Sequence, residues 1–250
     1  MEKNKPVIKL KDVSKTYTVH EQDTGSIRKK IWSLFTGNSA RKIKAISDVS
    51  FEVYKGEFFG IIGHNGSGKS TLINLISKAI KPDKGGQVER IGKYIRLSLG
   101  MGFNPNLSAR QNVMLNGTIL GIPKKEINKR VPEIIEFAGL TNFTHTQIKY
   151  FSTGMKARLA FAVAVLAEAD IFLMDEFFGG VGDQFFKKKA DEVFEKNLVK
   201  GRTIIHVSHS MQNIEKYCNR VLVLHEGKMV GVFKPKKAIR KYLSLMDKKK

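Results

Sequence analysis

The chain has 250 residues and a formal charge of +21 at pH 7, with 44 Lys and Arg against 23 Asp and Glu. Apolar residues make up 42% of the sequence, which is enough for a buried core and excludes a disordered chain. The longest nearly continuous apolar run, Leu159–Ala167, is about half of the ~20 residues that a helix needs to cross a bilayer. With one cysteine (Cys218), no intrachain disulfide is expected, and the positive charge favours an anionic partner without choosing nucleic acid, lipid or phosphate substrate.

Strand-length apolar runs alternate with helical patterns along the chain. A first strand is expected at Val7–Leu10, and a second strand region at about 43–54 follows a polar, basic stretch. Strands separated by helices predict an α/β fold, with a mostly parallel sheet and helices on its faces. Without an internal repeat, we expect one domain over residues 1–234 and a short basic, helical tail over 235–250. The other strand-length runs lie at 58–62, 171–174, 203–207 and 221–224.

A glycine-rich segment lies between the apolar run 58–62 and a helical pattern at Leu72–Ile76. It fits G-x-x-x-x-G-K-[ST], a phosphate loop in which backbone N–H groups and a helix N-terminus converge on phosphate oxygens. Lys69 is expected to reach the β- and γ-phosphates of ATP, and Ser70 to hold Mg²⁺. Strand, loop and helix in register make a chance glycine turn the weaker alternative. The ATP-binding residues expected here are Gly63, His64, Asn65, Gly66, Ser67, Gly68, Lys69, Ser70 and Thr71.

Two carboxylates and one histidine are the candidates for hydrolysis. Asp175 and Glu176 directly follow a buried-strand pattern; the first is expected in the Mg²⁺ shell and the second as general base toward water. His209 follows the expected strand 203–207, at the end of an open α/β sheet where ligands bind, and is expected to contact the γ-phosphate. The alternatives are an exposed acidic turn, which the phosphate loop upstream disfavours, and a structural histidine, which the position of His209 at a strand end disfavours.

With these motifs in order, the chain resembles the ABC ATPase family. The decisive segment is Phe151–Met155, a variant of the LSGGQ signature, which precedes a helical pattern at Lys156–Ala167. The resemblance implies a P-loop NTPase ABC cassette with a RecA-like core, an antiparallel β subdomain and a helical subdomain at about 100–165. It also implies a head-to-tail homodimer, in which each ATP lies between one phosphate loop and the partner's signature. The roles that it implies are signature contacts in trans for Ser152, Thr153, Gly154 and Met155, adenine stacking for Tyr17, and the D-loop for Asp183.

A narrower resemblance is to the ATPase subunits that export lipid-linked surface polysaccharides such as O-antigen, teichoic acid and capsule. The signature reads Y-F-S-T-G-M over 150–155, the D-loop ends in V-G-D over 181–183, and a basic insertion occupies 18–42. This resemblance implies two copies of an integral membrane permease as partners and a lipid-linked glycan as the substrate of the complex. It places the chain peripherally, at the cytoplasmic face of the cell membrane, with no nucleic-acid partner.

Two departures from the family pattern concern coupling and turnover. The position of the usual Q-loop glutamine falls near Leu99, where no glutamine stands, and Gln111 lies too far along the chain. Phe177 and Phe178 replace the small residues that usually follow the catalytic glutamate. We therefore expect altered coupling to the membrane partner through the segment around Leu99. Phe177 and Phe178 are expected to slow ATP turnover, and ATP binding should be retained.

The basic insertion has the pattern of a short amphipathic helix at about 26–35. Arg28, Lys29 and Lys30 flank its apolar face, and such a helix can lie at a membrane interface or against a partner helix. The alternative is an ordinary surface helix packed on its own domain. The apolar face consists of Ile27, Ile31, Leu34 and Phe35, with Trp32 beside it.

Two other functions remain open from the sequence. One is an ABC ATPase for another substrate, such as a different lipid or a peptide. The other is a soluble nucleic-acid- or ribosome-associated ABC ATPase, suggested by the +21 charge. The absence of a second phosphate loop and of a heptad run disfavours the soluble class.

Overall fold

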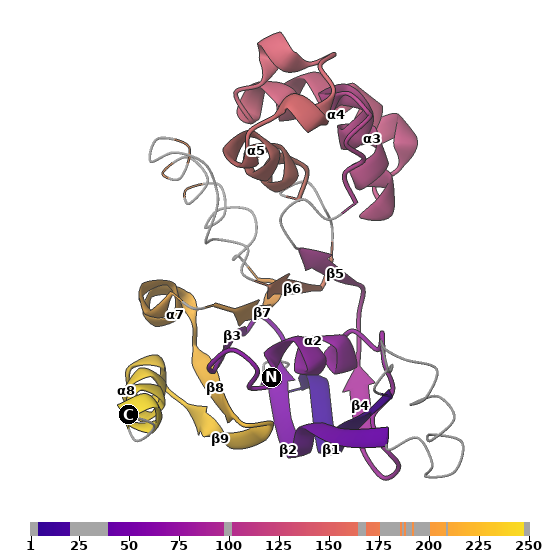
Figure 1. Cartoon of the computed structure of the whole chain (residues 1–250). Coiled ribbons are helices and arrows are strands. Elements are labelled where there is room, and N and C mark those ends of the chain that lie inside the picture. Colours follow the sequence, from indigo (N-terminus) through magenta and orange to yellow (C-terminus); the bar gives the residue numbers. More distant parts are fainter. Residues whose placement is uncertain are drawn as a thin grey trace, which may run out of the picture.

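A nine-stranded sheet of order β4-β1-β2-β9-β8-β3-β7-β6-β5 forms the centre of the molecule (Figure 1). The computed structural model describes residues 5–20, 40–97, 102–164, 169–175, 186, 188, 192, 201–208 and 210–247. The strands are β1 (Pro6–His20), β2 (Ala40–Tyr54), β3 (Phe58–Ile62), β4 (Gln87–Arg90), β5 (Tyr94–Leu97), β6 (Ile171–Asp175), β7 (Thr203–Val207), β8 (Arg220–His225) and β9 (Lys228–Phe233).

One half of the sheet is parallel and buried. β8, β3, β7, β6 and β5 run side by side in the same direction, and every residue of β3 and β7 is buried. A strand covered on both faces needs apolar side chains at successive positions, which explains why these strands are short continuous apolar runs in the sequence. The α/β prediction is therefore confirmed, and four of these five strands fall on the expected runs.

The other half is antiparallel and built from β1, β2 and β4. β1 and β2 are each 15 residues long, so both exceed the strands expected from the sequence. Their pairing continues through Thr18–Lys42 to His20–Ala40, inside the expected insertion 18–42. The outer part of β1, at 15–20, is rich in polar residues, and β2 begins only three residues before its expected range, at a segment that contains Arg41 and Lys42, which is why an apolar pattern did not reveal these ends. The rest of that insertion, including the expected helix at 26–35, lies outside the described residues.

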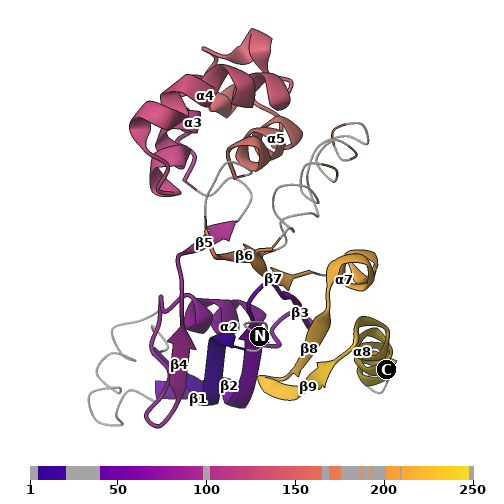
Figure 2. The ribbon, with the colours of Figure 1, turned by 180° about the vertical axis from the view of Figure 1, so that it is seen from behind.

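Helices lie on both faces of the sheet and in a separate group. α2 packs one face, and α7 and α8 flank the other, whereas α3, α4 and α5 gather beyond β5 (Figures 1 and 2). None of the described helices combines the length and apolar character needed to traverse a bilayer. The helices are α2 (Lys69–Ile76), α3 (Ala109–Ile119), α4 (Lys124–Phe137), α5 (Thr153–Ala164), α7 (Met211–Tyr217) and α8 (Pro235–Asp247), with 3₁₀ turns η1 (Thr141–Phe143) and η2 (Ile148–Tyr150).

The amphipathicity of the strands and helices divides the core into three clusters. Along β3, Phe59 and Ile61 face the α2 side, while Phe58 and Ile62 face the side of α7 and α8, because neighbouring strand residues point to opposite faces. α8 buries Ala238 fully against the cluster on the side of α7 and α8, so the expected tail is a docked helix over its described residues 235–247. The third cluster lies within the helical group α3, α4 and α5.

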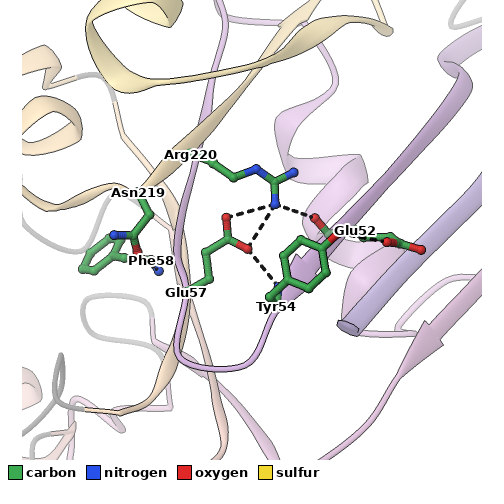
Figure 3. Close-up of polar contacts among 6 residues, drawn as sticks. All are labelled: Glu52, Tyr54, Glu57, Phe58, Asn219 and Arg220. Carbon is green, nitrogen blue, oxygen red and sulfur yellow. Dashed lines mark hydrogen bonds and ion pairs between the residues drawn. The ribbon is translucent and has the colours of Figure 1, made fainter. Parts of the chain in front are cut away.

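A partly buried ion pair joins the turn before β3 to the start of β8 (Figure 3). Arg220 Nη1 lies 3.2 Å from Glu57 Oε1 and 3.3 Å from Glu57 Oε2, and it also donates to the Glu52 carbonyl at 3.4 Å. Glu57 Oε2 accepts the Tyr54 backbone N–H at 2.8 Å, so both carboxylate oxygens are satisfied. The Glu57 side chain is only 7% exposed. This pair holds the antiparallel strand β2 against the parallel half of the sheet.

Candidate functional site

The glycine-rich segment forms a loop between β3, which ends at Ile62, and α2, which begins at Lys69. Gly66 and Gly68 have φ angles of 80° and 103°, which residues with a side chain rarely adopt. Within the loop, the Ser67 N–H donates to the His64 carbonyl at 3.1 Å. The backbone therefore curls into the compact turn that the motif predicted.

Close packing makes one of these glycines necessary and leaves the other facing open space. A Cβ on Gly68 would lie 2.6 Å from the Ala45 carbonyl oxygen and 2.8 Å from Ile46 Cδ1. A Cβ on Gly66 would meet nothing within 4 Å. The loop is thus held against β2 on one side, and its Gly66 side is open to an incoming ligand.

Lys69 is the charged centre of the loop. Its side chain is buried, with the residue 8% exposed, and Nζ donates to the Gly63 carbonyl at 2.8 Å and the His64 carbonyl at 3.0 Å. The N-terminus of α2 has no side-chain cap and no acidic residue in its first turn, and Ser70 there is exposed. Free helix N–H groups and an ammonium group at one place form a site suited to an anion.

Strand register places the expected metal-binding aspartate at the same edge as the loop. β7 lies between β3 and β6, with Val207 opposite Ile61 on one side and opposite Asp175 on the other. The backbone of Asp175 is therefore about two strand spacings, ~10 Å, from the strand that leads into the loop. Glu176, Asp183 and His209 lie outside the described residues, as do Leu99, Phe177 and Phe178.

The signature segment lies elsewhere in the same chain. Ser152 precedes α5, and its Oγ accepts the Met155 N–H at 3.2 Å, as an N-terminal cap does. Ser152 and Thr153 are exposed, whereas Gly154 and Met155 are half-buried. In both views α5 lies in the helical group, on the far side of β5 from α2 (Figures 1 and 2). One chain therefore does not bring its signature and its phosphate loop together.

Tyr17 lies on the antiparallel sheet. Its side chain is on β1, paired with Ile43 of β2, and the residue is 37% exposed. Lys15 Nζ lies 5.8 Å from the centroid of the Tyr17 ring. An exposed aromatic ring with a cation beside it can stack on a planar ligand.

The turn between β8 and β9 supports the phosphate loop, and the sequence did not reveal this contact. The Gly227 N–H donates to the Ser67 carbonyl at 2.9 Å, and the His225 ring packs edge-on against the His64 ring at 5.1 Å between centroids. The turn follows the loop by about 160 residues, and no short motif links segments so distant. Only the sheet order, which places β8 beside β3, brings them together.

Burial shifts the pKa of two side chains near the sheet. His206 on β7 is buried against Phe58, and burial lowers its pKa to about 4. Burial raises the pKa of the Cys218 thiol to about 12, so this cysteine is an inert core residue. Both groups are therefore neutral near pH 7.

The strand, the curled glycine loop and the helix that follows it define a P-loop nucleotide-binding protein. The profile of the ABC transporter family matches residues 46–179, more than half of the chain. The chain belongs to the ABC transporter family and is one of its nucleotide-binding ATPases.

Curated relatives cover almost the whole chain. The O-antigen export system ATP-binding protein RfbB of Klebsiella pneumoniae is 37% identical over 247 residues, 96% of this chain and 99% of the relative. The teichoic acids export ATP-binding protein TagH of Enterococcus faecalis is also 37% identical, over 96% of this chain and 53% of the relative. This chain thus spans about half the length of that TagH protein.

Solved structures share the fold. The dimeric post-hydrolysis state of the ATP-binding cassette MJ0796, bound to ADP and phosphate, has a TM-score of 0.69 and 25% identity. The match covers 91% of this chain and 98% of that one. The predicted fold class, a P-loop ABC cassette, is therefore confirmed, as is the predicted family.

Proposed function

We propose that this chain is the ATP-binding and ATP-hydrolysing subunit of an ABC transporter that exports a lipid-linked surface polysaccharide of the teichoic acid or O-antigen type. The observation that carries the proposal is the end-to-end similarity to an O-antigen export ATP-binding protein, 99% of which is covered. Similarity to TagH supports the same class of substrate. The proposal favours export of a glycan over export of another lipid or a peptide.

The residues at the loop edge fit ATP and Mg²⁺. Lys69 Nζ lies at the carbonyls of Gly63 and His64 in the loop, the Gly66 side of the loop is open, and Ser70 is exposed. In our proposal Lys69 and the loop N–H groups bind the β- and γ-phosphates, and Ser70 and Asp175 would hold Mg²⁺, which would neutralise phosphate charge. Glu176 accepts a proton from the attacking water, and His209 orients that water.

The second half of each ATP site comes from another copy of the chain. The separation of α5 from α2 within one chain supports this, because Ser152 and Gly154 can then reach phosphate only in trans. Thr153 and Met155 complete the signature, Tyr17 stacks on adenine, and Asp183 lies at the dimer interface. Closure of such a dimer is a rigid-body motion that ATP favours through its contacts in the closed state.

Two permease copies in the membrane are the partners that receive this motion. The subunit is peripheral at the cytoplasmic face, and the lipid-linked glycan is handled through the permease. Residues 26–35, expected from the sequence to form an amphipathic helix, contact the permease or lipid near substrate entry in this proposal. No nucleic acid takes part.

Affinity purification tests this function. The tagged Glu176→Gln variant, which holds ATP in the dimer, is purified from its native membrane in mild detergent, and co-purifying proteins and lipids are identified by mass spectrometry. An integral membrane protein with a polyprenyl-linked glycan is the expected result. An integral partner with another ligand would reject polysaccharide export, and ribosomes or DNA without a membrane protein would reject transport.

A further inference from the structure

A cavity of about 760 Å³ lies at the edge of the sheet opposite the phosphate loop. Lys55 precedes β3, Asp170 precedes β6 and Thr203 begins β7, so these lining residues stand at the amino ends of the parallel strands. The phosphate loop and Asp175 stand at the carboxyl ends of the same strands. The volume falls within the range of cavities that hold small molecules, roughly 300–1,000 Å³.

Positive charge exceeds negative charge at this cavity. Of the described residues that line it, Lys5, Lys55 and Arg202 are cationic, and Asp170 is the one carboxylate. Asp170 Oδ2 already accepts the backbone N–H of Lys93 at 2.7 Å, and the Lys93 side chain lines an adjoining hollow with Asp170 and Arg202. This excess of cations favours an anionic ligand.

Some of the cations are held in place and others can adapt. The Arg202 guanidinium lies 5.3 Å from the centroid of the Phe172 ring, in a cation–π contact that fixes its position. Lys5 and Lys55 are exposed at the rim. A fixed guanidinium with two adaptable ammonium groups suits a phosphate or carboxylate, which accepts several hydrogen bonds at once.

Apolar residues also line the cavity. Pro6 and Val7 at the start of β1 and Ile91 after β4 line it, and Ile91 is 56% exposed. Gly201 adds further open space, because a Cβ there would meet nothing within 4 Å. An exposed apolar wall beside a cluster of cations is the composition expected for an amphiphilic anion.

We propose that this cavity binds an organic anion with an apolar part, such as a monoalkyl phosphate. The anionic group contacts Arg202 and Lys55, and the alkyl part lies against Ile91 and Val7. The site is separate from the nucleotide site, so the inference stands whether or not the proposed export function is correct. The same chemistry occurs in a free amphiphile and in an anionic lipid headgroup.

The test is a calorimetric titration of the full chain with dodecyl phosphate below its critical micelle concentration. Saturating Mg·ADP is present so that the phosphate loop is occupied. Arg202→Glu and Lys55→Glu are each expected to weaken binding at least about tenfold, and Ile91→Ser about tenfold through the lost apolar contact. Lys241→Glu, which reverses an exposed lysine on α8, is the matched control and should leave the affinity unchanged.

Two ligand controls define the chemistry. Inorganic phosphate and the uncharged dodecyl maltoside should each bind at least about tenfold more weakly than dodecyl phosphate. Equal affinity for either one would overturn an amphiphilic-anion site, as would dodecyl phosphate binding that neither charge reversal changes, or no binding at all. Lys55 lies in an exposed turn, so its variant keeps the test valid if Arg202→Glu fails to fold.

Sedimentation with phosphatidylglycerol vesicles then separates the two sources of the ligand. Retention of the wild-type chain, lost in Lys55→Glu and kept in Lys241→Glu, assigns a lipid headgroup. Binding of dodecyl phosphate without vesicle retention assigns a free amphiphile. Both results support the site, and they differ only in where the ligand comes from.

Discussion

The two edges of the parallel sheet are built in different ways. At the carboxyl edge the phosphate loop depends on backbone, because Gly68 has a left-handed φ and no room for a Cβ beside Ala45. At the amino edge the chain is held by side chains, chiefly the pair Arg220–Glu57 in Figure 3. The comparison shows that one set of short strands supports the phosphate loop at one end and, at the other, a structural joint near the proposed anion cavity. Changes at the two edges should therefore affect different properties.

Lys69→Ala should have the largest effect, and it should act chiefly on binding. The change removes the ammonium group from the loop, so we expect ATP affinity to fall by about 100-fold or more, since a charge-assisted contact to phosphate is lost. Fluorescent ATP titration measures the affinity, and the loss of two hydrogen bonds to loop carbonyls should lower the free energy of unfolding without nucleotide by only about 1–2 kcal/mol. Lys84→Ala, at an exposed turn residue, is the control. Unchanged affinity in Lys69→Ala would remove this lysine from the site.

Glu176→Gln should separate catalysis from ATP binding. Loss of the proposed general base should slow hydrolysis by about 100-fold or more while ATP affinity is kept, which would trap an ATP-bound dimer visible by size-exclusion chromatography. Hydrolysis at the wild-type rate would show that Glu176 is not the base.

At the amino edge, breaking the ion pair should change stability alone. Arg220→Met leaves the 7%-exposed Glu57 carboxylate without its partner, so we expect urea unfolding to show a loss of about 3 kcal/mol. The double variant Glu57→Met with Arg220→Met should recover most of this loss, because no charge remains buried. ATP affinity should stay within about twofold of wild type in all of them. A large loss of ATP affinity in folded Arg220→Met would mean that the two edges are coupled.

His206 lies on β7, one of the parallel strands that run from one edge of the sheet to the other. Its burial should make the free energy of unfolding depend on pH. Burial lowers its pKa to about 4, so the unfolded chain, with a histidine pKa of ~6.5, takes up the proton first as the pH falls. The stability is complete above pH 6.5 and is lost toward pH 4, by about 2 kcal/mol at pH 5. His206→Leu should remove this part of the pH dependence, whereas His145→Gln, at an exposed histidine, should not. Parallel stability curves for wild type and His206→Leu would contradict the assignment.

The sequence allowed us to predict those features of the fold and site that depend on short-range sequence patterns. The parallel strands and the phosphate loop are recognisable because buried strands need continuous apolar residues and the loop needs glycines at fixed spacing. The full length of β1 was not predictable, since its outer part is rich in polar residues and its pairing with β2 decides the conformation. Nor were the contact of Gly227 with Ser67 and the pair Arg220–Glu57, because each joins residues about 160 positions apart that only the sheet order brings together.

The smallest expected effect lies in the helical group, away from both edges. Ser108 caps α3: its Oγ accepts the Gln111 N–H at 3.3 Å, and Gln111 Oε1 accepts the Ser108 N–H at 2.9 Å. Ser108→Ala removes one half of this reciprocal cap, so urea unfolding should show a loss of about 1 kcal/mol with ATP affinity unchanged. Thr118→Ala, near the other end of the same helix, removes only a bond from Thr118 Oγ1 back to the Met114 carbonyl and should stay within about 0.5 kcal/mol of wild type. Equal losses in the two variants would mean that the cap contributes nothing specific. A fall in ATP affinity in Ser108→Ala would mean that the helical group is coupled to the phosphate loop even within a single chain.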